Sequence, residues 1–361
     1  MRERSSEVRR LGSGIAMAVA LAWAAGCGAD GTRAGFEGTD TDPTQGGEDG
    51  AGAGGGGGGN VPAPQPDRVG CAGDKYSEAL PTTASLSGIA FSPATAQDYL
   101  VEALGRRFPE GKFIAEGGMA NPLPGNPSCF EQFVGDKSSS AAVLRRASTI
   151  VHECGHFFDL SQGKGSTSTY VITSELRLSC KSGDTTKRGG RTFERSRLNG
   201  DAYASKHPKC AGQGQQGCDF YAQIYLDGSP TDSQFQGGDQ GYNSVLEEAT
   251  QYVNSLATAL AFPEVYQGTK VSERDGILTF LWYIERYLKM AREQYPEAYE
   301  LLSTDECWRQ ATLTVWDRGR FFLEATKDEA NLGIQDSKLE GLVADADLVA
   351  EIDALRKLEC K

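Results

Sequence analysis

Two histidines four residues apart constrain this chain more than any other feature of its sequence. They occur in the stretch Val151-His152-Glu153-Cys154-Gly155-His156-Phe157-Phe158-Asp159. On a helix, residues four apart lie one turn from each other on the same face, so both imidazoles can reach one metal ion. Glu153 points to the side of that pair, where it can accept a proton from a metal-bound water. Two neutral imidazoles plus a carboxylate suit zinc, so the stretch predicts a Zn²⁺ site on a helix.

The residues before the histidines support this helix, which we expect over residues 140–160. Ser138-Ser139-Ser140 offers hydroxyls for the helix N-cap. Gly155 costs about 1 kcal/mol relative to alanine inside a helix. That cost is explained if another segment or a substrate passes close to the backbone, although a glycine tolerated near a helix end is an equal alternative. Apolar residues recur at helical spacing, namely Ala141, Val143, Leu144, Ala147, Ile150, Val151 and Cys154.

The segment from His152 to His156 resembles the HExxH pattern of the zincin metallopeptidases. This resemblance implies an α+β, helix-rich, zincin-like metallopeptidase domain with a helical C-terminal part, which hydrolyses peptide bonds. Glu153 would act as the general base toward the attacking water and then deliver the proton to the leaving amine. One alternative is a non-catalytic exported zinc-binding protein on a zincin scaffold, against which the intact Glu153 speaks. Another is a helix whose histidines are hydrogen-bonded core residues without a metal.

The third metal ligand is expected on a helix over residues 243–262. Metzincins carry a third histidine soon after the motif, but residues 157–163 contain none. Gluzincins take a glutamate from a downstream helix, which the segment around Glu247-Glu248 resembles. A helical wheel places Glu248 beside Tyr252 on the flank of the apolar face and Glu247 almost opposite that face. Glu248 is preferred, yet the apolar spacing after Glu247 resembles some gluzincin helices, so both stay open.

Further residues are expected around the ligands. Asp159 lies one turn past His156, where a carboxylate can orient a metal-bound imidazole, and a plain aspartate near a helix end is an equal alternative. Tyr252 is expected beside the metal without binding it. His207 and Asp201 are the fallback choices for the third ligand. The resemblance also implies a residue that stabilises the oxyanion, and its candidates are Tyr170, Tyr203, Tyr242, Tyr252 and His207.

Residues 1–27 are typical of an export signal. Four arginines precede an apolar run over residues 15–25, which is too short for a stable transmembrane span. The ending Ala24-Ala25-Gly26-Cys27 resembles a bacterial lipobox. It predicts lipidation of Cys27 and an outer-membrane or cell-surface lipoprotein, held to the membrane only through this anchor. An ordinary signal-peptidase cut and a secreted protein are the alternative, because Ala24 stands where leucine is usual.

Composition divides the rest of the chain into a linker and one folded domain. Residues 28–70 are rich in Gly, Asp, Thr and Pro and cannot bury enough apolar surface to offset their ordering entropy. The zincin-like domain is expected over residues 71–361. Eight of the nine cysteines lie in it, and an even number in an exported chain predicts disulfides. The net charge of −13 argues against a nucleic-acid partner, and the resemblance to zincins implies a peptide or protein substrate.

Periodicity and turn residues predict the remaining elements. Helices are expected over residues 93–108, 272–295, 305–325 and 338–358, and a strand or strand pair over residues 169–178. Residues 109–136, rich in Gly, Pro and Asn, predict mostly loop with a short strand at 112–115. Ser272 and Asp275 predict a capping-box-like helix start.

Overall fold

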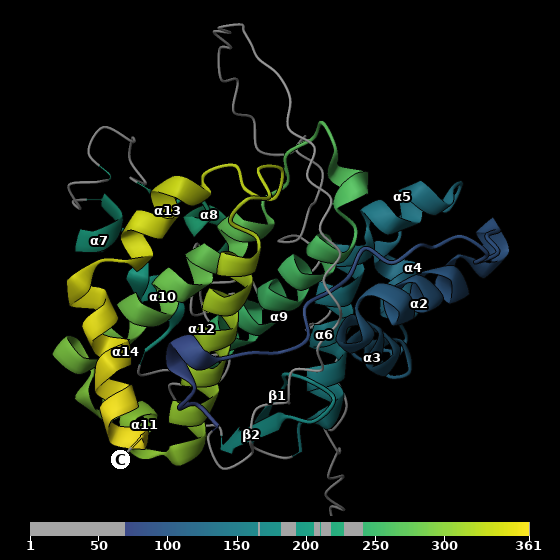
Figure 1. Ribbon diagram of the computed structural model, residues 1–361. Coiled ribbons are helices and arrows are strands. Elements are labelled where there is room, and N and C mark those ends of the chain that lie inside the picture. The colour runs from purple at the N-terminus through teal and green to yellow at the C-terminus, as the bar shows by residue number, and fades with distance from the viewer. Residues whose placement is uncertain are drawn as a thin grey trace, which may run out of the picture.

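The computed structural model describes residues 69–164, 167–181, 193–205, 210, 218–226 and 241–360 (Figure 1). The expected export signal, Cys27, nearly all of the linker and His207 lie outside the described residues. Helices dominate the described chain, and one two-stranded sheet accompanies them, which confirms the prediction of a helix-rich α+β protein. No described helix is both long and apolar enough to cross a membrane.

Short helices are interspersed among longer ones, and the longest three belong to the second half of the chain. In order, the helices are η2 (Gly73–Lys75), η3 (Pro93–Thr95), α2 (Ala96–Arg107), α3 (Pro109–Met119), α4 (Cys129–Phe133), α5 (Ser140–Arg145), α6 (Ala147–Gln162), η4 (Arg195–Leu198), α7 (Ala202–Ser205), α8 (Ala222–Tyr225), α9 (Tyr242–Ala261), η7 (Pro263–Tyr266), α10 (Glu273–Gln294), α11 (Pro296–Thr304), α12 (Glu306–Ala325), α13 (Asp336–Val343) and α14 (Ala346–Glu359). The strands β1 (Thr167–Val171) and β2 (Arg177–Lys181) follow α6.

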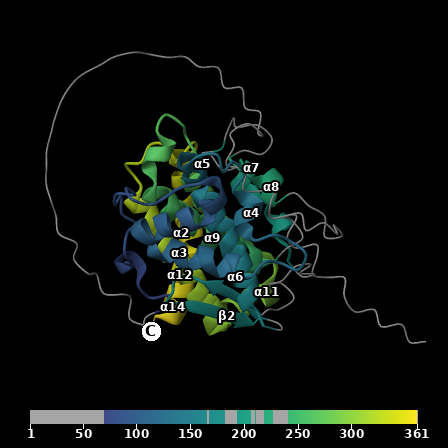
Figure 2. The same cartoon turned by 90° about the vertical axis from the view of Figure 1, so that its right-hand side faces the viewer.

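The helices pack in successive layers with α9 at the centre. Helix α3 packs on α6, α6 packs on α9, and α9 contacts both α10 and α12, while α13 and α14 cover the outer side of α10 (Figure 1). Figure 2 looks onto the side that α2, α3 and α6 form. The antiparallel hairpin lies below these layers, with β1 against α6 and β2 against α12. This order places α6 and α9, the two helices with the expected ligands, directly against each other.

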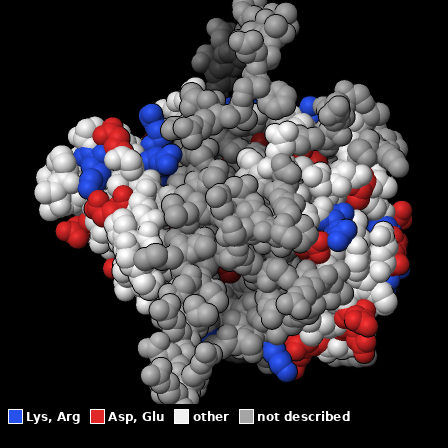
Figure 3. All heavy atoms as spheres, turned by 180° about the vertical axis from the view of Figure 1, so that it is seen from behind, with Lys and Arg blue, Asp and Glu red and all other residues white. Residues whose placement is uncertain are grey.

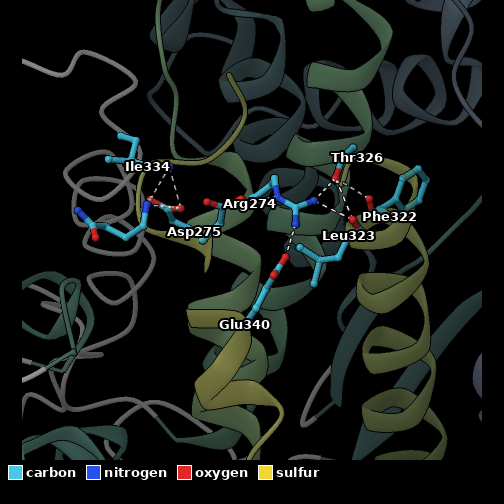
Figure 4. A network of polar contacts seen from close by, with 9 residues as sticks. Arg274, Asp275, Phe322, Leu323, Thr326, Ile334 and Glu340 are labelled. Atoms are coloured by element: carbon cyan, nitrogen blue, oxygen red, sulfur yellow. Dashed lines mark hydrogen bonds and ion pairs between the residues drawn. The ribbon is translucent and has the colours of Figure 1, made fainter. Parts of the chain in front are cut away.

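Helix α10 starts at an anchored turn rather than at the expected capping box. The side chain of Ser272 caps nothing. Asp275 instead accepts hydrogen bonds from the backbone N–H groups of Ile334 and Gln335 at 3.1 Å each (Figure 4). Beside it, the buried Arg274 donates to the Leu323 carbonyl at 2.7 Å and pairs with Glu340. The start of α10 is therefore fixed by long-range contacts with the end of α12 and with the chain after it.

Four disulfides tie the described elements together and confirm the prediction of disulfides. Cys129–Cys154 joins α4 to α6, and Cys180–Cys307 joins β2 to α12. The first and last parts of the described chain are joined by Cys71–Cys360, and Cys210–Cys218 closes a short loop.

Several expected boundaries were wrong. Residues 109–119 form the helix α3, where loop and a short strand were expected. The helix expected over residues 140–160 is divided into α5 and α6, which meet at Arg146. The helix expected over residues 338–358 is likewise divided, because Asp345 accepts a hydrogen bond from the Asp347 N–H and caps α14.

Figure 3 shows the molecule from behind, relative to Figure 1. On this face, the described residues at both flanks include acidic and basic side chains next to each other.

Candidate metal centre

Three buried side chains from α6 and α9 meet at one point. His152 and His156 come from successive turns of α6, and Glu248 comes from α9. The two imidazole Nε2 atoms are 3.1 Å apart. Glu248 Oε2 lies 3.5 Å from His152 Nε2 and 3.8 Å from His156 Nε2. Among the described residues this is the one group of His, Cys, Asp or Glu side chains that could hold a metal ion.

The three ligand atoms fit a small tetrahedral metal ion. Bonds of about 2.0–2.1 Å, as imidazole nitrogen and carboxylate oxygen form with zinc, place tetrahedral ligand atoms about 3.3 Å apart. The observed separations of 3.1, 3.5 and 3.8 Å enclose that value. Glu248 Oε2 is also fully buried and has no hydrogen-bond partner among the described residues. A bound cation would satisfy this oxygen, whose burial alone is costly.

Glu247, the neighbour of Glu248, occupies the other side of the histidine pair. Its Oε1 lies 3.0 Å from His156 Nδ1. A carboxylate in this position favours the imidazole tautomer with the proton on Nδ1, which leaves the Nε2 lone pair toward Glu248. The structure therefore brings Glu248 to the ligand atoms and Glu247 to the back of His156, which suits the preference for Glu248 as a ligand.

Asp159 supports Glu247 rather than an imidazole. Its carboxyl group is hydrogen-bonded to Glu247 and accepts from the Val171 N–H at 2.8 Å and from Gln251 Nε2 at 2.9 Å. Burial raises the pKa of both Asp159 and Glu247 well above their ordinary values, and the charge of Asp159 raises the pKa of Glu247 further. Burial and the proximity of the two groups therefore make both carboxyl groups harder to ionise than in water.

The two imidazoles have opposite pKa shifts. Burial lowers the pKa of His156 well below its ordinary value, and the neighbouring His152 adds to this. Burial acts in the same direction on His152, but the carboxylates of Glu248 and Glu153 outweigh it and raise the pKa of His152. Within the described chain, no Lys or Arg forms an ion pair with Asp159, Glu247 or Glu248. The centre thus concentrates buried carboxyl groups without a paired basic side chain, as a cation site does.

Close contact between α6 and α9 depends on Gly155. A Cβ atom at this position would lie 1.8 Å from Gln251 Oε1. Of the two explanations open from the sequence, the close approach of another segment is the one the structure supports. Gly276 plays the same part between α10 and α9, since its Cβ would lie 2.1 Å from the ring of Tyr252. These two glycines let α6, α9 and α10 approach closely enough to assemble the centre.

Glu153 and Cys154 lie between the two histidines and have different surroundings. Glu153 is fully buried, and its charge acts on His152. Cys154 points toward α4 and forms the disulfide with Cys129. The disulfide therefore fastens the ligand-bearing turn of α6 to a neighbouring helix.

Of the expected tyrosines, Tyr252 is the one that contacts a ligand. Its ring packs edge-on against His152, with the ring centroids 4.8 Å apart. The hydroxyls of Tyr170 and Tyr242 bond to the Asn243 carbonyl and to Thr312, respectively, in the core. Tyr203 lies beside Lys289 on α10.

Tyr225 belongs to the centre although it could not be singled out from the sequence. Its hydroxyl lies 2.6 Å from that of Tyr252, so it reaches the neighbourhood of His152 through one contact. The only sequence signal was the spacing of Tyr221 and Tyr225, four residues apart as on one helix face.

Arg286 of α10 holds the segment that carries Tyr225. The buried guanidinium donates to Asp219 at 2.8 Å and to Asp201 at 3.0 Å. Asp201, a fallback choice for the third ligand, is therefore engaged in an ion pair away from the histidines.

Gln251 was also not expected at the centre. Its signal in the sequence was a polar residue one turn after Glu247 within an apolar helix.

Comparisons with protein-family models, with curated proteins and with solved structures found no match for this chain.

Proposed function

We propose that this protein is an exported zinc metallopeptidase. The observation that carries the proposal is the assembly of His152, His156 and Glu248 with buried Glu153 on the same turn of α6. Two imidazoles and one carboxylate are the ligand set of one class of catalytic zinc site, which keeps its fourth position for water or substrate. Imidazole ligands disfavour magnesium and calcium, which prefer oxygen atoms.

The roles of the side chains follow from their positions. His152, His156 and Glu248 would hold zinc, which when bound lowers the pKa of a coordinated water and polarises a carbonyl group. Glu247 orients His156 through Nδ1. Glu153 accepts the proton of the attacking water as the new C–O bond forms, and it donates that proton to the leaving amine when the amide C–N bond then breaks.

The surroundings of Tyr252 suggest how the transition state is stabilised. A tyrosine hydroxyl beside the metal can donate a hydrogen bond to the oxyanion that develops on the scissile carbonyl. The ring of Tyr252 packs against His152, and the hydrogen bond of 2.6 Å between the hydroxyls of Tyr252 and Tyr225 fixes both groups, so we assign this role to Tyr252 with Tyr225 as its support. A peptide or protein is the substrate class, and no nucleic acid is involved.

The four disulfides favour the exported location. Disulfides form and persist outside the cytosol of most bacteria. We accordingly propose a lipoprotein anchored through Cys27, or a secreted protein if an ordinary signal peptidase removes the signal.

The test is the Glu153→Gln variant of the full chain. It is expected to retain one zinc ion and to lose hydrolysis of a peptide library by about 10²- to 10⁴-fold, the range that acid–base catalysis contributes. Glu351→Gln is the matched control, because Glu351 is also buried but pairs with Arg292 far from the centre. Zinc-loaded wild type that cleaves no peptide would favour the alternative, a non-catalytic zinc-binding protein.

A further inference from the structure

A chain of buried hydrogen bonds runs from α12 across α9 to α6. Arg318 Nη1 on α12 donates to Asn254 Oδ1 at 2.7 Å. Asn254 Nδ2 donates to Gln251 Oε1 at 2.9 Å, and Gln251 Nε2 donates to Asp159 Oδ2 at 2.9 Å. All four side chains are at least 97% buried. Four neighbouring polar groups are thus satisfied by one another inside the apolar core.

This chain ends at the metal centre. Asp159 is hydrogen-bonded to Glu247, and Glu247 Oε1 lies 3.0 Å from His156 Nδ1. Every link from Arg318 to the candidate ligand His156 is therefore a direct side-chain contact.

Because Arg318 can only donate, it fixes which groups donate and which accept along the chain of hydrogen bonds. A guanidinium group only donates hydrogen bonds, so the atom of Asn254 that faces Arg318 must be the amide oxygen. The amide nitrogen of Asn254 then faces Gln251, whose oxygen must accept and whose nitrogen is left to donate to Asp159. Amide orientations are usually ambiguous, but here Arg318 determines both of them. Asp159 consequently always receives a donor from Gln251.

We propose that Asn254 and Arg318 are positioning residues of the metal centre. Through Gln251 and Asp159 they fix the carboxylate of Glu247, which orients His156. The inference rests on the proposed function, because it concerns the same metal ion. Supporting carboxylates behind a metal-bound imidazole typically change the metal affinity about 10- to 100-fold.

The chain also reaches the start of the folded domain. Arg318 donates to Glu78 from Nε at 2.8 Å and from Nη2 at 3.1 Å, and the Tyr76 hydroxyl donates to Glu78 at 2.6 Å. Glu78, near the start of the domain, therefore fixes the Arg318 guanidinium, whose position determines the amide orientations in the chain of hydrogen bonds.

Two variants of Asn254 separate polarity from shape. Asn254→Asp keeps the size of the side chain and the acceptor toward Arg318, but it replaces the donor toward Gln251 with an acceptor. Asn254→Leu removes both groups at similar volume. We expect each to weaken zinc binding about tenfold in a competition assay with a chelator. A role in shape alone would leave Asn254→Asp like wild type.

Thr258→Val is the matched control on the same helix. Thr258 is equally buried and donates to the Asn254 carbonyl at 2.7 Å, but its side chain is not part of the chain of amides. Its zinc affinity is expected to stay within about twofold of wild type, although it also loses one buried hydrogen bond. A second pair of variants is Arg318→Lys and Arg274→Lys, since Arg274 is also buried but bonds to the end of α12 and to α13 (Figure 4).

Cobalt absorption supplies a readout that lost stability alone does not change. In the Co²⁺-loaded protein, the visible spectrum reports the geometry of the ligands. It is expected to shift in both Asn254 variants and in Arg318→Lys, and to stay unchanged in Thr258→Val and Arg274→Lys. Wild-type affinity and spectrum in both Asn254 variants and in Arg318→Lys would overturn the positioning role and leave the proposed function standing. Failure of wild type to bind zinc or cobalt would instead refute the proposed function itself.

Discussion

Removal of the disulfide Cys129–Cys154 is expected to weaken both the fold and the metal centre. Cys154 lies inside the ligand-bearing turn, directly after Glu153 and directly before Gly155. Its bond to Cys129 fastens that turn to α4. In the double variant Cys129→Ala/Cys154→Ala, the turn keeps its helical hydrogen bonds but loses this covalent attachment.

The separation of the two cysteines gives the size of the effect on stability. The bond closes a loop of 25 residues. Chain entropy for a loop of this length corresponds to about 3.5 kcal/mol of unfolding free energy at 25 °C. The affinity for zinc should also fall, by about tenfold, which is typical for the loss of a contact that supports a ligand.

The double variant Cys71→Ala/Cys360→Ala is the control. Its disulfide spans 289 residues, and the other disulfides inside that span shorten the effective loop. The expected loss of unfolding free energy is larger, about 5 kcal/mol. The bond lies outside α6 and α9, and Glu78 keeps its ion pair with Arg318 without it, so zinc affinity should stay near that of wild type.

Denaturant unfolding with a chelator present measures the stability of both metal-free proteins, and competition with a chelator measures zinc affinity. The two double variants are expected to rank in opposite order in the two assays. Equal losses of affinity in both, or a loss of less than about 1 kcal/mol for Cys129→Ala/Cys154→Ala, would refute the reasoning.

Three further predictions follow from buried contacts. Gly155→Ala places a Cβ atom 1.8 Å from Gln251 Oε1, so it should lower the unfolding free energy by about 1–3 kcal/mol despite the better helix propensity of alanine; unchanged denaturant unfolding would contradict this. Glu285 is fully buried, and burial raises its pKa well above the ordinary 4.5. The folded chain therefore holds this proton more tightly than the unfolded chain, and stability falls as the pH rises above about 4.5. Relative to wild type, the unfolding free energy of Glu285→Gln should therefore rise by up to about 1.4 kcal/mol for each pH unit above about 4.5. A difference that does not depend on pH would rule this out. Zinc at a hundredfold excess over its dissociation constant should add about 2.7 kcal/mol to the unfolding free energy, whereas calorimetry showing no shift would argue against binding to the folded state.

The helices were most predictable from sequence where their apolar residues recur over many turns. Helix α10 is an example, since its residues from Ile277 to Leu288 are all buried. Residues 109–119 were misjudged because their glycines are unfavourable in an isolated helix. In the fold these glycines permit close packing, as a Cβ at Gly118 would lie 2.1 Å from the Cys154 carbonyl oxygen. That benefit depends on α6 and cannot be recognised from local residues.

The part of the candidate centre that lies on the single helix α6 was predictable from sequence. His152, Glu153 and His156 are placed by helical spacing alone. The distinction between Glu247 and Glu248 required the crossing of α6 and α9. The helical wheel favoured Glu248, whose Oε2 lies beside the Nε2 atoms of both histidines, whereas Glu247 contacts Nδ1 of His156. Tyr225 could not be found, because its position depends on contacts that Arg286 makes far along the chain.

Metal content of the purified full chain tests the central claim most directly. After dialysis, elemental analysis of wild type is expected to give one zinc ion per chain. Glu248→Ala should give none, because only two imidazoles remain as protein ligands, whereas Glu247→Ala should retain zinc with an affinity lowered about 10- to 100-fold. Wild type without zinc, or full zinc content in both His152→Ala and Glu248→Ala, would contradict the account.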